Sequence, residues 1–102
     1  MDLKTYCPNK LMAAEDAVEL IKRGSRVFIG TGCGEPQHLI RSLVENNQLQ
    51  DIMIYQMLSH TLAEYVDNPS FLRRFSLKLF FISQDMRKAA FEGKIDYLPM
   101  YL

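Results

Sequence analysis

Residues 30–36 have the residue types and spacing that best fit chemistry. They read Gly-Thr-Gly-Cys-Gly-Glu-Pro, with glycine at three alternate positions. Glycine tolerates positive φ and lets the backbone approach a bound group closely. A short apolar run, residues 27–29, precedes this segment, and residues 37–45 follow with four apolar side chains on one helical stripe: Leu39, Ile40, Leu43 and Val44. The pattern predicts a buried strand, a tight turn and a helix.

The start of this helix favours a negatively charged ligand or a developing negative charge. Pro36 fits the first helical turn, and the free N–H groups there point back at the loop with partial positive charge. The dinucleotide motif would require glycine where Glu35 stands, and the Gly-Lys-Ser/Thr of a Walker loop is absent from the sequence. The segment therefore predicts a ligand loop of an α/β fold, and the alternative is a structural glycine turn without a ligand.

Each reactive side chain near the loop has a chemical and a structural interpretation. Cys33 is a candidate nucleophile or a small residue that fits a tight turn, and Glu35 is a candidate nucleophile or base, or an acid held by the helix dipole. We favour the structural interpretation for both. The amide of Gln37 suits a carboxylate or carbonyl, unless it is simply an exposed first-turn side chain. His38 and His60 lie in unrelated segments, so we expect no metal site.

Apolar runs alternate with amphipathic stretches along the rest of the chain, and these elements must position the loop. We expect an extended lead-in over residues 1–11, strands over 27–29, 52–58, 77–82 and 96–102, and helices that begin near residues 14, 37 and 84, the last capped by Ser83. Short connections between alternating elements predict a parallel sheet with right-handed crossovers. The expected fold is therefore α/β, an open parallel sheet of about four strands with helices on both faces.

The bulk composition excludes several classes of function. The chain has 102 residues, one domain at most, and its twelve basic and twelve acidic residues cancel, which argues against nucleic acid as the main partner. No apolar run reaches the length of a membrane span, and the N-terminus does not resemble a signal peptide. Cys7 and Cys33 lie far apart without metal-type spacing, so we expect a reduced, cytoplasmic setting.

Several stretches follow the pattern of one family. They are residues 10–18, 24–30 and 32–37, of which Gly-Glu-Pro-Gln is the most specific part, and then 80–82, 86–89 and 96–102. In these stretches the chain resembles the acetyl-CoA hydrolase/transferase family, which includes 4-hydroxybutyrate CoA-transferase. The resemblance implies that the chain is the incomplete N-terminal part of an open α/β CoA-transferase-like fold.

The resemblance also implies an activity and its partners. The family moves CoA between an acyl-CoA thioester and a small carboxylate through a glutamyl–CoA intermediate, with coenzyme A thioester as substrate and no further cofactor. Its nucleophilic glutamate would lie beyond Leu102, so this chain would hold no catalytic residue. The chain would supply one wall of the substrate pocket, formed by Gly32, Cys33, Gly34, Glu35, Pro36 and Gln37. The C-terminal half of the same enzyme would be its partner.

Other expectations concern how the chain works on its own. An incomplete sheet exposes apolar surface, so we expect self-association near residues 97–102 and a homo-oligomer. The chain ends within an apolar run, which suggests a piece of a longer protein. Two alternatives remain beside the enzyme: a small α/β module that binds an anionic ligand, and a partner-dependent fragment with no activity. The role of residues 59–69 is open.

Overall fold

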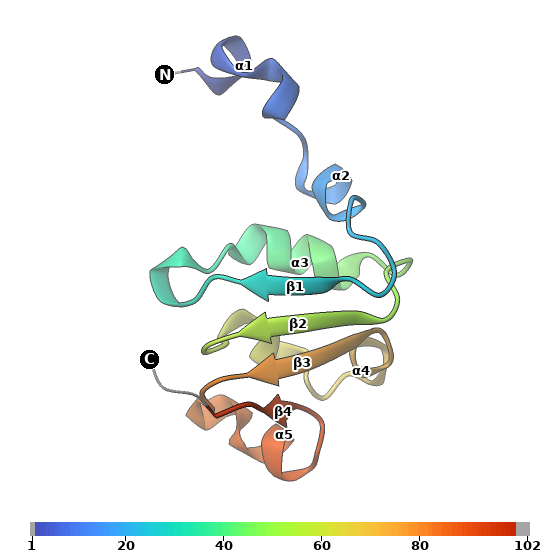
Figure 1. Cartoon of the computed structure of the whole chain (residues 1–102), viewed down its shortest axis with the longest axis vertical. Coiled ribbons are helices and arrows are strands. Elements are labelled where there is room, and N and C mark those ends of the chain that lie inside the picture. The colour runs from blue at the N-terminus through green and yellow to red at the C-terminus, as the bar shows by residue number, and fades with distance from the viewer. Residues whose placement is uncertain (1, 100–102) are drawn as a thin grey trace.

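The computed structural model describes residues 2–99, which form one sheet, the helices that cover it, and an N-terminal segment that projects away from them (Figure 1). The strands are β1 (Arg26–Ile29), β2 (Ile52–Gln56), β3 (Phe75–Leu79) and β4 (Asp96–Tyr97). The α-helices are α1 (Leu3–Tyr6), α2 (Ala14–Val18), α3 (Gln37–Glu45), α4 (Pro69–Arg74) and α5 (Arg87–Phe91). Short 3-10 turns are η1 (Pro8–Lys10), η2 (Gly32–Gly34), η3 (Thr61–Glu64) and η4 (Gln84–Met86).

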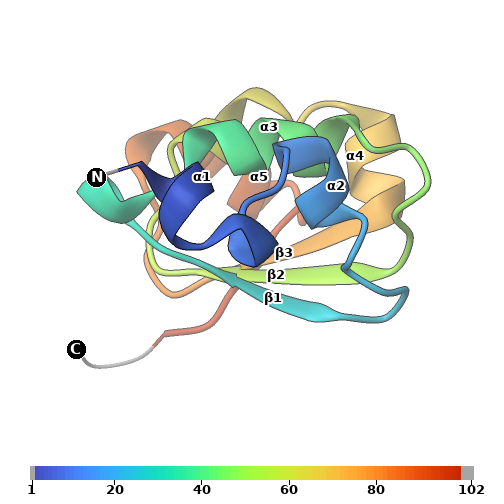
Figure 2. The same cartoon turned by 90° about the horizontal axis from the view of Figure 1, so that it is seen from above.

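The four strands are all parallel and lie in the order β1-β2-β3-β4, which confirms the expected open sheet. Each strand pairs with the next one along the chain. Successive right-handed crossovers in one direction place every connecting helix on the same face. Figure 2 shows the described helices on one side of the sheet. The expectation of helices on both faces therefore does not hold within residues 2–99.

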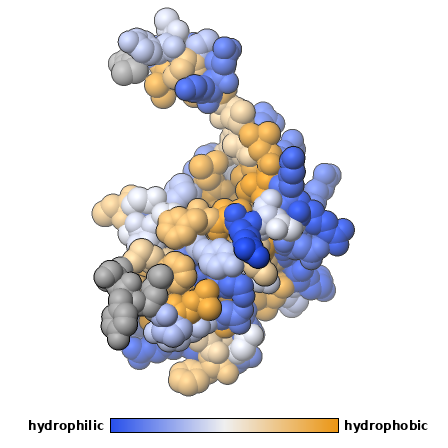
Figure 3. Space-filling model, in the orientation of Figure 1, coloured by the Kyte–Doolittle hydropathy of each residue, from blue (hydrophilic) through white to orange (hydrophobic). Residues whose placement is uncertain are grey.

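Burial alternates along the strands because only one face is covered. On β2, Ile52 and Ile54 are buried while Met53 and Tyr55 are only partly so. Phe28 on β1 is 64% exposed on the uncovered face. In Figure 3, which looks onto this face, apolar side chains gather over the strands between polar ones. The core lies on the other face and includes Ile40, Leu62, Phe71, Leu77, Leu79 and Met86.

Several elements differ from the expectation for local reasons. The lead-in is not extended, because the carboxylate of Asp2 accepts a hydrogen bond from the Lys4 N–H and starts α1, and η1 follows it. Pro36 precedes α3 as its N-cap instead of occupying the first turn. Ser83 makes no capping hydrogen bond to η4. The described part of the fourth strand is Asp96–Tyr97, and residues 100–102 lie outside the described chain.

Arg74 fixes the position of α3, although its sequence context, Arg73-Arg74, is typical of a solvated face. Its side chain is buried and donates to the carbonyl oxygens of Val44 and Asn46, both at 2.9 Å, at the end of α3. The guanidinium carbon also lies 5.0 Å from the centre of the Phe75 ring. Burial lowers the pKa of the Arg74 guanidinium, which nevertheless stays charged. Unpaired carbonyls at a helix end need such donors, so this cation ties α4 to α3.

No helix within residues 2–99 is both long and apolar enough to span a membrane.

Candidate functional site

The glycine loop forms a tight turn at the carboxyl end of β1. Gly32 has a φ of +63°, a region that few residues other than glycine adopt readily. The Gly34 N–H donates to the Thr31 carbonyl at 3.1 Å, and the Glu35 N–H donates to the Gly32 carbonyl at 3.2 Å. These two hydrogen bonds close a 3-10 turn over Gly32–Gly34, and all three of its residues are exposed to solvent.

The six expected binding residues divide into two groups by their exposure. Gly32, Cys33, Gly34, Pro36 and Gln37 are exposed, and Cys33 is a free cysteine. Glu35 is only 9% exposed. The structure therefore brings the six residues together in space but directs the one carboxylate of the loop inward.

The first turn of α3 supplies hydrogen-bond donors beside this loop. The Gln37 N–H is taken by the Glu35 carbonyl at 3.0 Å, and the Ile40 N–H by the Pro36 carbonyl at 3.0 Å. Among the described residues, the N–H groups of His38 and Leu39 have no such acceptor. Free N–H groups at a helix start favour an anion. The arrangement suits a carboxylate or a carbonyl oxygen that develops negative charge.

Three hydrogen-bonded contacts join the glycine loop to β2 and the segment after it. The Gln56 side-chain amide donates to the Gly30 carbonyl at 3.1 Å. The Thr31 hydroxyl donates to the Leu58 carbonyl at 2.6 Å and accepts from the Leu58 N–H at 3.0 Å. The third contact is between the Thr61 N–H and the carboxylate of Glu35, at 3.0 Å. The turn after β1 and the segment after β2 are thus held as one unit.

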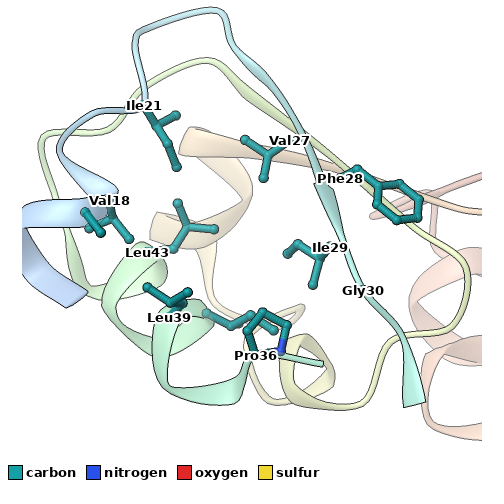
Figure 4. A pocket seen from close by; sticks show the side chains of 11 residues that line it. Val18, Ile21, Val27, Phe28, Ile29, Gly30, Pro36, Leu39 and Leu43 are labelled. Atoms are coloured by element: carbon teal, nitrogen blue, oxygen red, sulfur yellow. The ribbon is translucent and has the colours of Figure 1, made fainter. Parts of the chain in front are cut away.

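An apolar groove of about 250 Å³ lies beside the loop, between α2, α3 and β1 (Figure 4). Gly30 and Pro36 line its end nearest the loop, and Val18, Ile21, Val27 and Leu39 are among its other lining residues. Of the six expected binding residues, Pro36 alone lines this groove. A groove with such a lining suits apolar side chains better than an anionic group.

Sequence patterns did not single out Gln56 as part of the site, and they placed Thr31 in the glycine loop without a role of its own. The signal for Gln56 was a single amide in the otherwise apolar run of residues 52–58, since a buried polar side chain requires a partner. Gln56 is fully buried, and its Oε1 has no hydrogen-bond partner among the described residues, like the hydroxyls of Ser59 and Ser83. These polar atoms lie at or beyond the carboxyl ends of β2 and β3, where ligands of parallel sheets bind.

The two histidines of the chain do not belong to a cluster of potential metal ligands within residues 2–99. That part of the chain contains no group of three or more histidine, cysteine, aspartate or glutamate side chains placed to hold an ion. His38 and His60 are both exposed and lie on α3 and just before η3.

Comparisons with known proteins agree on one family. A model described as the acetyl-CoA hydrolase/transferase N-terminal domain matches residues 1–102. The chain is 30% identical over 102 residues to 4-hydroxybutyrate coenzyme A transferase of Clostridium kluyveri, covering 99% of this chain and 24% of that protein. It is 31% identical over 91 residues to a succinyl-CoA:acetate/propanoyl-CoA:succinate CoA transferase of Fasciola hepatica, covering 86% of this chain and 18% of that protein.

A solved structure shows the same fold within a longer protein. RipA from Yersinia pestis superimposes with a TM-score of 0.83 at 20% sequence identity, over 99% of this chain and 26% of RipA. The chain thus spans about a quarter or less of these relatives and neighbours. Since the family model matches every residue, the chain belongs to the acetyl-CoA hydrolase/transferase family and corresponds to its N-terminal domain.

Proposed function

We propose that this chain supplies one wall of the substrate site in an enzyme that moves CoA between an acyl-CoA thioester and a small carboxylate. Family membership supports this proposal, as do the names of two relatives, both CoA transferases. The observation that carries it is the exposed turn at Gly32–Gly34 next to the N–H groups of His38 and Leu39, which have no acceptor among the described residues. A donor array of this kind suits the oxygen of a thioester or a carboxylate.

The proposed chemistry passes through a glutamyl–CoA intermediate. A glutamate carboxylate from outside this chain attacks the thioester carbonyl, and CoA thiolate leaves as an acyl–glutamyl anhydride forms. The thiolate then attacks the glutamyl carbonyl, which gives the glutamyl–CoA thioester and releases the acyl group as a carboxylate. A second carboxylate then attacks the glutamyl–CoA carbonyl and expels CoA thiolate, which attacks the acceptor's carbonyl in the new anhydride and gives the new acyl-CoA and the free glutamate. In a hydrolase, water attacks the glutamyl–CoA carbonyl instead and releases CoA and the free glutamate. Each attack puts negative charge on a carbonyl oxygen, and preorganised N–H donors lower that barrier.

Glu35 is not the nucleophile of this proposal. A nucleophilic carboxylate must reach the substrate carbonyl, whereas Glu35 is mostly buried and accepts a hydrogen bond from Thr61. We therefore assign no catalytic residue to this chain. The exposed loop contributes binding and charge stabilisation, with Gly32, Cys33, Gly34, Pro36 and Gln37 nearest the substrate.

The remainder of a longer enzyme is the proposed partner. The uncovered face of the sheet exposes Phe28 and the apolar groove lies open beside β1, so both surfaces lack a cover within residues 2–99. Exposed apolar surface of this kind is typical of interaction sites. A second half of the same enzyme, in a homo-oligomer, would bury it and bring the nucleophile to the glycine loop.

A chimera tests the proposal. This chain would replace the matched N-terminal quarter of the Clostridium kluyveri transferase, and CoA transfer between acetyl-CoA and a set of small carboxylates would be measured. We expect transfer, and we expect borohydride to trap the glutamyl thioester on the relative's portion, as seen by mass spectrometry. The isolated chain should release thiol from acetyl-CoA at the background rate.

Two controls make the result interpretable. Circular dichroism and light scattering must show that the chimera folds and assembles like the parent enzyme. A folded, assembled chimera without transfer or hydrolysis would reject the proposal.

Isothermal titration of the isolated chain with acetate and phosphate tests the alternative, a small module that binds anions. Turnover by the isolated chain that disappears in Glu35→Ala would place the nucleophile in this chain instead.

A further inference from the structure

Glu35 caps an element from another part of the chain. The first residue of η3, Thr61, donates its N–H to Glu35 Oε1 at 3.0 Å, and Thr61 is only 6% exposed. The residue before it, His60, makes no side-chain capping bond to η3. Since the N–H groups at a helical start need acceptors, the carboxylate of Glu35 performs across 26 residues what a neighbouring side chain normally does.

The Glu35 carboxylate is buried, so it needs contacts that compensate for its lost hydration. A buried charge is unfavourable unless hydrogen bonds compensate for lost hydration. Glu35 has the Thr61 N–H as such a partner and lies two residues before α3, where the helix dipole also favours negative charge. An exposed carboxylate would be expected at this place if its role were only to complement the dipole.

Two further contacts hold the same pair of segments. The hydroxyl of Thr31 bonds both backbone groups of Leu58, and the Gln56 amide bonds the Gly30 carbonyl. They act at the start of the glycine loop, whereas the Glu35–Thr61 bond acts at its end. Residues 56–61 are therefore fixed to both ends of the glycine loop, and the Glu35–Thr61 bond is the contact that reaches residues 59–64.

We propose that Glu35 is a positioning residue that, through Thr61, holds residues 59–64 beside the glycine loop as a second wall of the substrate site. The second-wall role rests on the proposed function, while the fastening of the segment does not. In this role Glu35 needs an acceptor oxygen at the carboxylate position and no proton transfer. The isosteric amide of Glu35→Gln keeps such an oxygen, whereas Glu35→Ala removes it.

Amide hydrogen exchange of the full chain tests the fastening. In Glu35→Ala, exchange of the Thr61 amide should accelerate at least about tenfold, as expected for losing a hydrogen bond to a charged acceptor. In Glu35→Gln it should stay within about threefold of wild type. Glu45→Ala, which changes an exposed glutamate at the end of α3, is the matched control and should leave Thr61 unchanged. Amides of β2 report whether each variant is folded.

Kinetics of the chimera test the second wall. Glu35→Ala should lower kcat/KM by about 10- to 100-fold, since a small displacement of a positioning element can cost that much. Glu35→Gln should retain activity within about threefold and keep the wild-type pH profile, which an essential acid or base would not. The inference is wrong if Glu35→Gln lowers kcat/KM as much as Glu35→Ala does. It is also wrong if the exchange rate of the Thr61 amide is unchanged in both variants. An inactive wild-type chimera with a responsive Thr61 amide would reject the proposed function and the second wall while supporting the fastening.

Discussion

The closure of the glycine loop depends on the absence of a side chain at Gly30. A Cβ at this position would lie 2.9 Å from the Gly34 carbonyl oxygen and 3.5 Å from its carbonyl carbon. Unbonded heavy atoms prefer roughly 3.5–4.0 Å, so Gly30→Ala must push the end of η2 outward by about half an ångström. Because a Cβ is fixed by the backbone of its own residue and meets only backbone atoms of Gly34, no side-chain rotation can relieve the contact.

The magnitude follows from two opposing effects. Overpacking costs about 1–3 kcal/mol, and the reduced entropy of the unfolded chain offsets roughly 0.4–1 kcal/mol of it. We therefore expect Gly30→Ala to lower the free energy of unfolding by about 1–2 kcal/mol. For a domain of this size that corresponds to a Tm lower by roughly 4–15 °C. Urea and thermal unfolding followed by circular dichroism measure both quantities.

Gly34→Ala is the matched control within the same loop. A Cβ at Gly34 meets nothing within 4 Å, and its φ is not positive, so this variant should be as stable as wild type or gain roughly 0.4–1 kcal/mol. A Gly30→Ala variant as stable as wild type, or a Gly34→Ala variant that loses more stability than Gly30→Ala, would contradict the predicted collision.

Two further predictions concern the helix anchor and the loop surface. Arg74→Ala leaves the Val44 and Asn46 carbonyls without their donor and should cost about 1–3 kcal/mol in urea unfolding, whereas exposed Arg73→Ala should stay within about 0.5 kcal/mol; equal losses would contradict the anchoring role. In the chimera, Gly34→Val should block substrate approach and lower kcat/KM by ~100- to 1,000-fold, while Cys33→Ala should be mild; the reverse order in steady-state kinetics would mean that the thiol carries the chemistry.

Apolar periodicity predicted most of the fold. It located β1, β2 and β3 to within about three residues of their ends and indicated their parallel order, because buried parallel strands read as continuous apolar runs. The same signal led to the incorrect expectation of helices on both faces. Met53 and Tyr55 do lie opposite the covered face, but a sequence pattern shows only that a strand face needs a cover and not which element provides it.

The site was predictable only where its structure is local. Glycine spacing and the apolar stripe of α3 located the turn and the helix that follows it. The contacts of Gln56, Glu35 and Arg74 join residues 26–30 positions apart, and local patterns carry no information on such pairs. Glu35 could thus be assigned to the helix dipole from the sequence, while its link to Thr61 required the fold.

The place of the glycine loop in the sheet gives a physical reason for a partner. Ligands of open parallel sheets bind where neighbouring strands connect in opposite directions, because the loops there part and leave a crevice. The order β1-β2-β3-β4 contains no such reversal among the described strands, and β1 lies at the edge. A crevice at the end of β1 therefore needs an element on its free side, next to the apolar groove that Figure 4 shows. We expect the same addition to cover this groove and to complete the proposed substrate site, so that assembly and the proposed activity depend on the same surface.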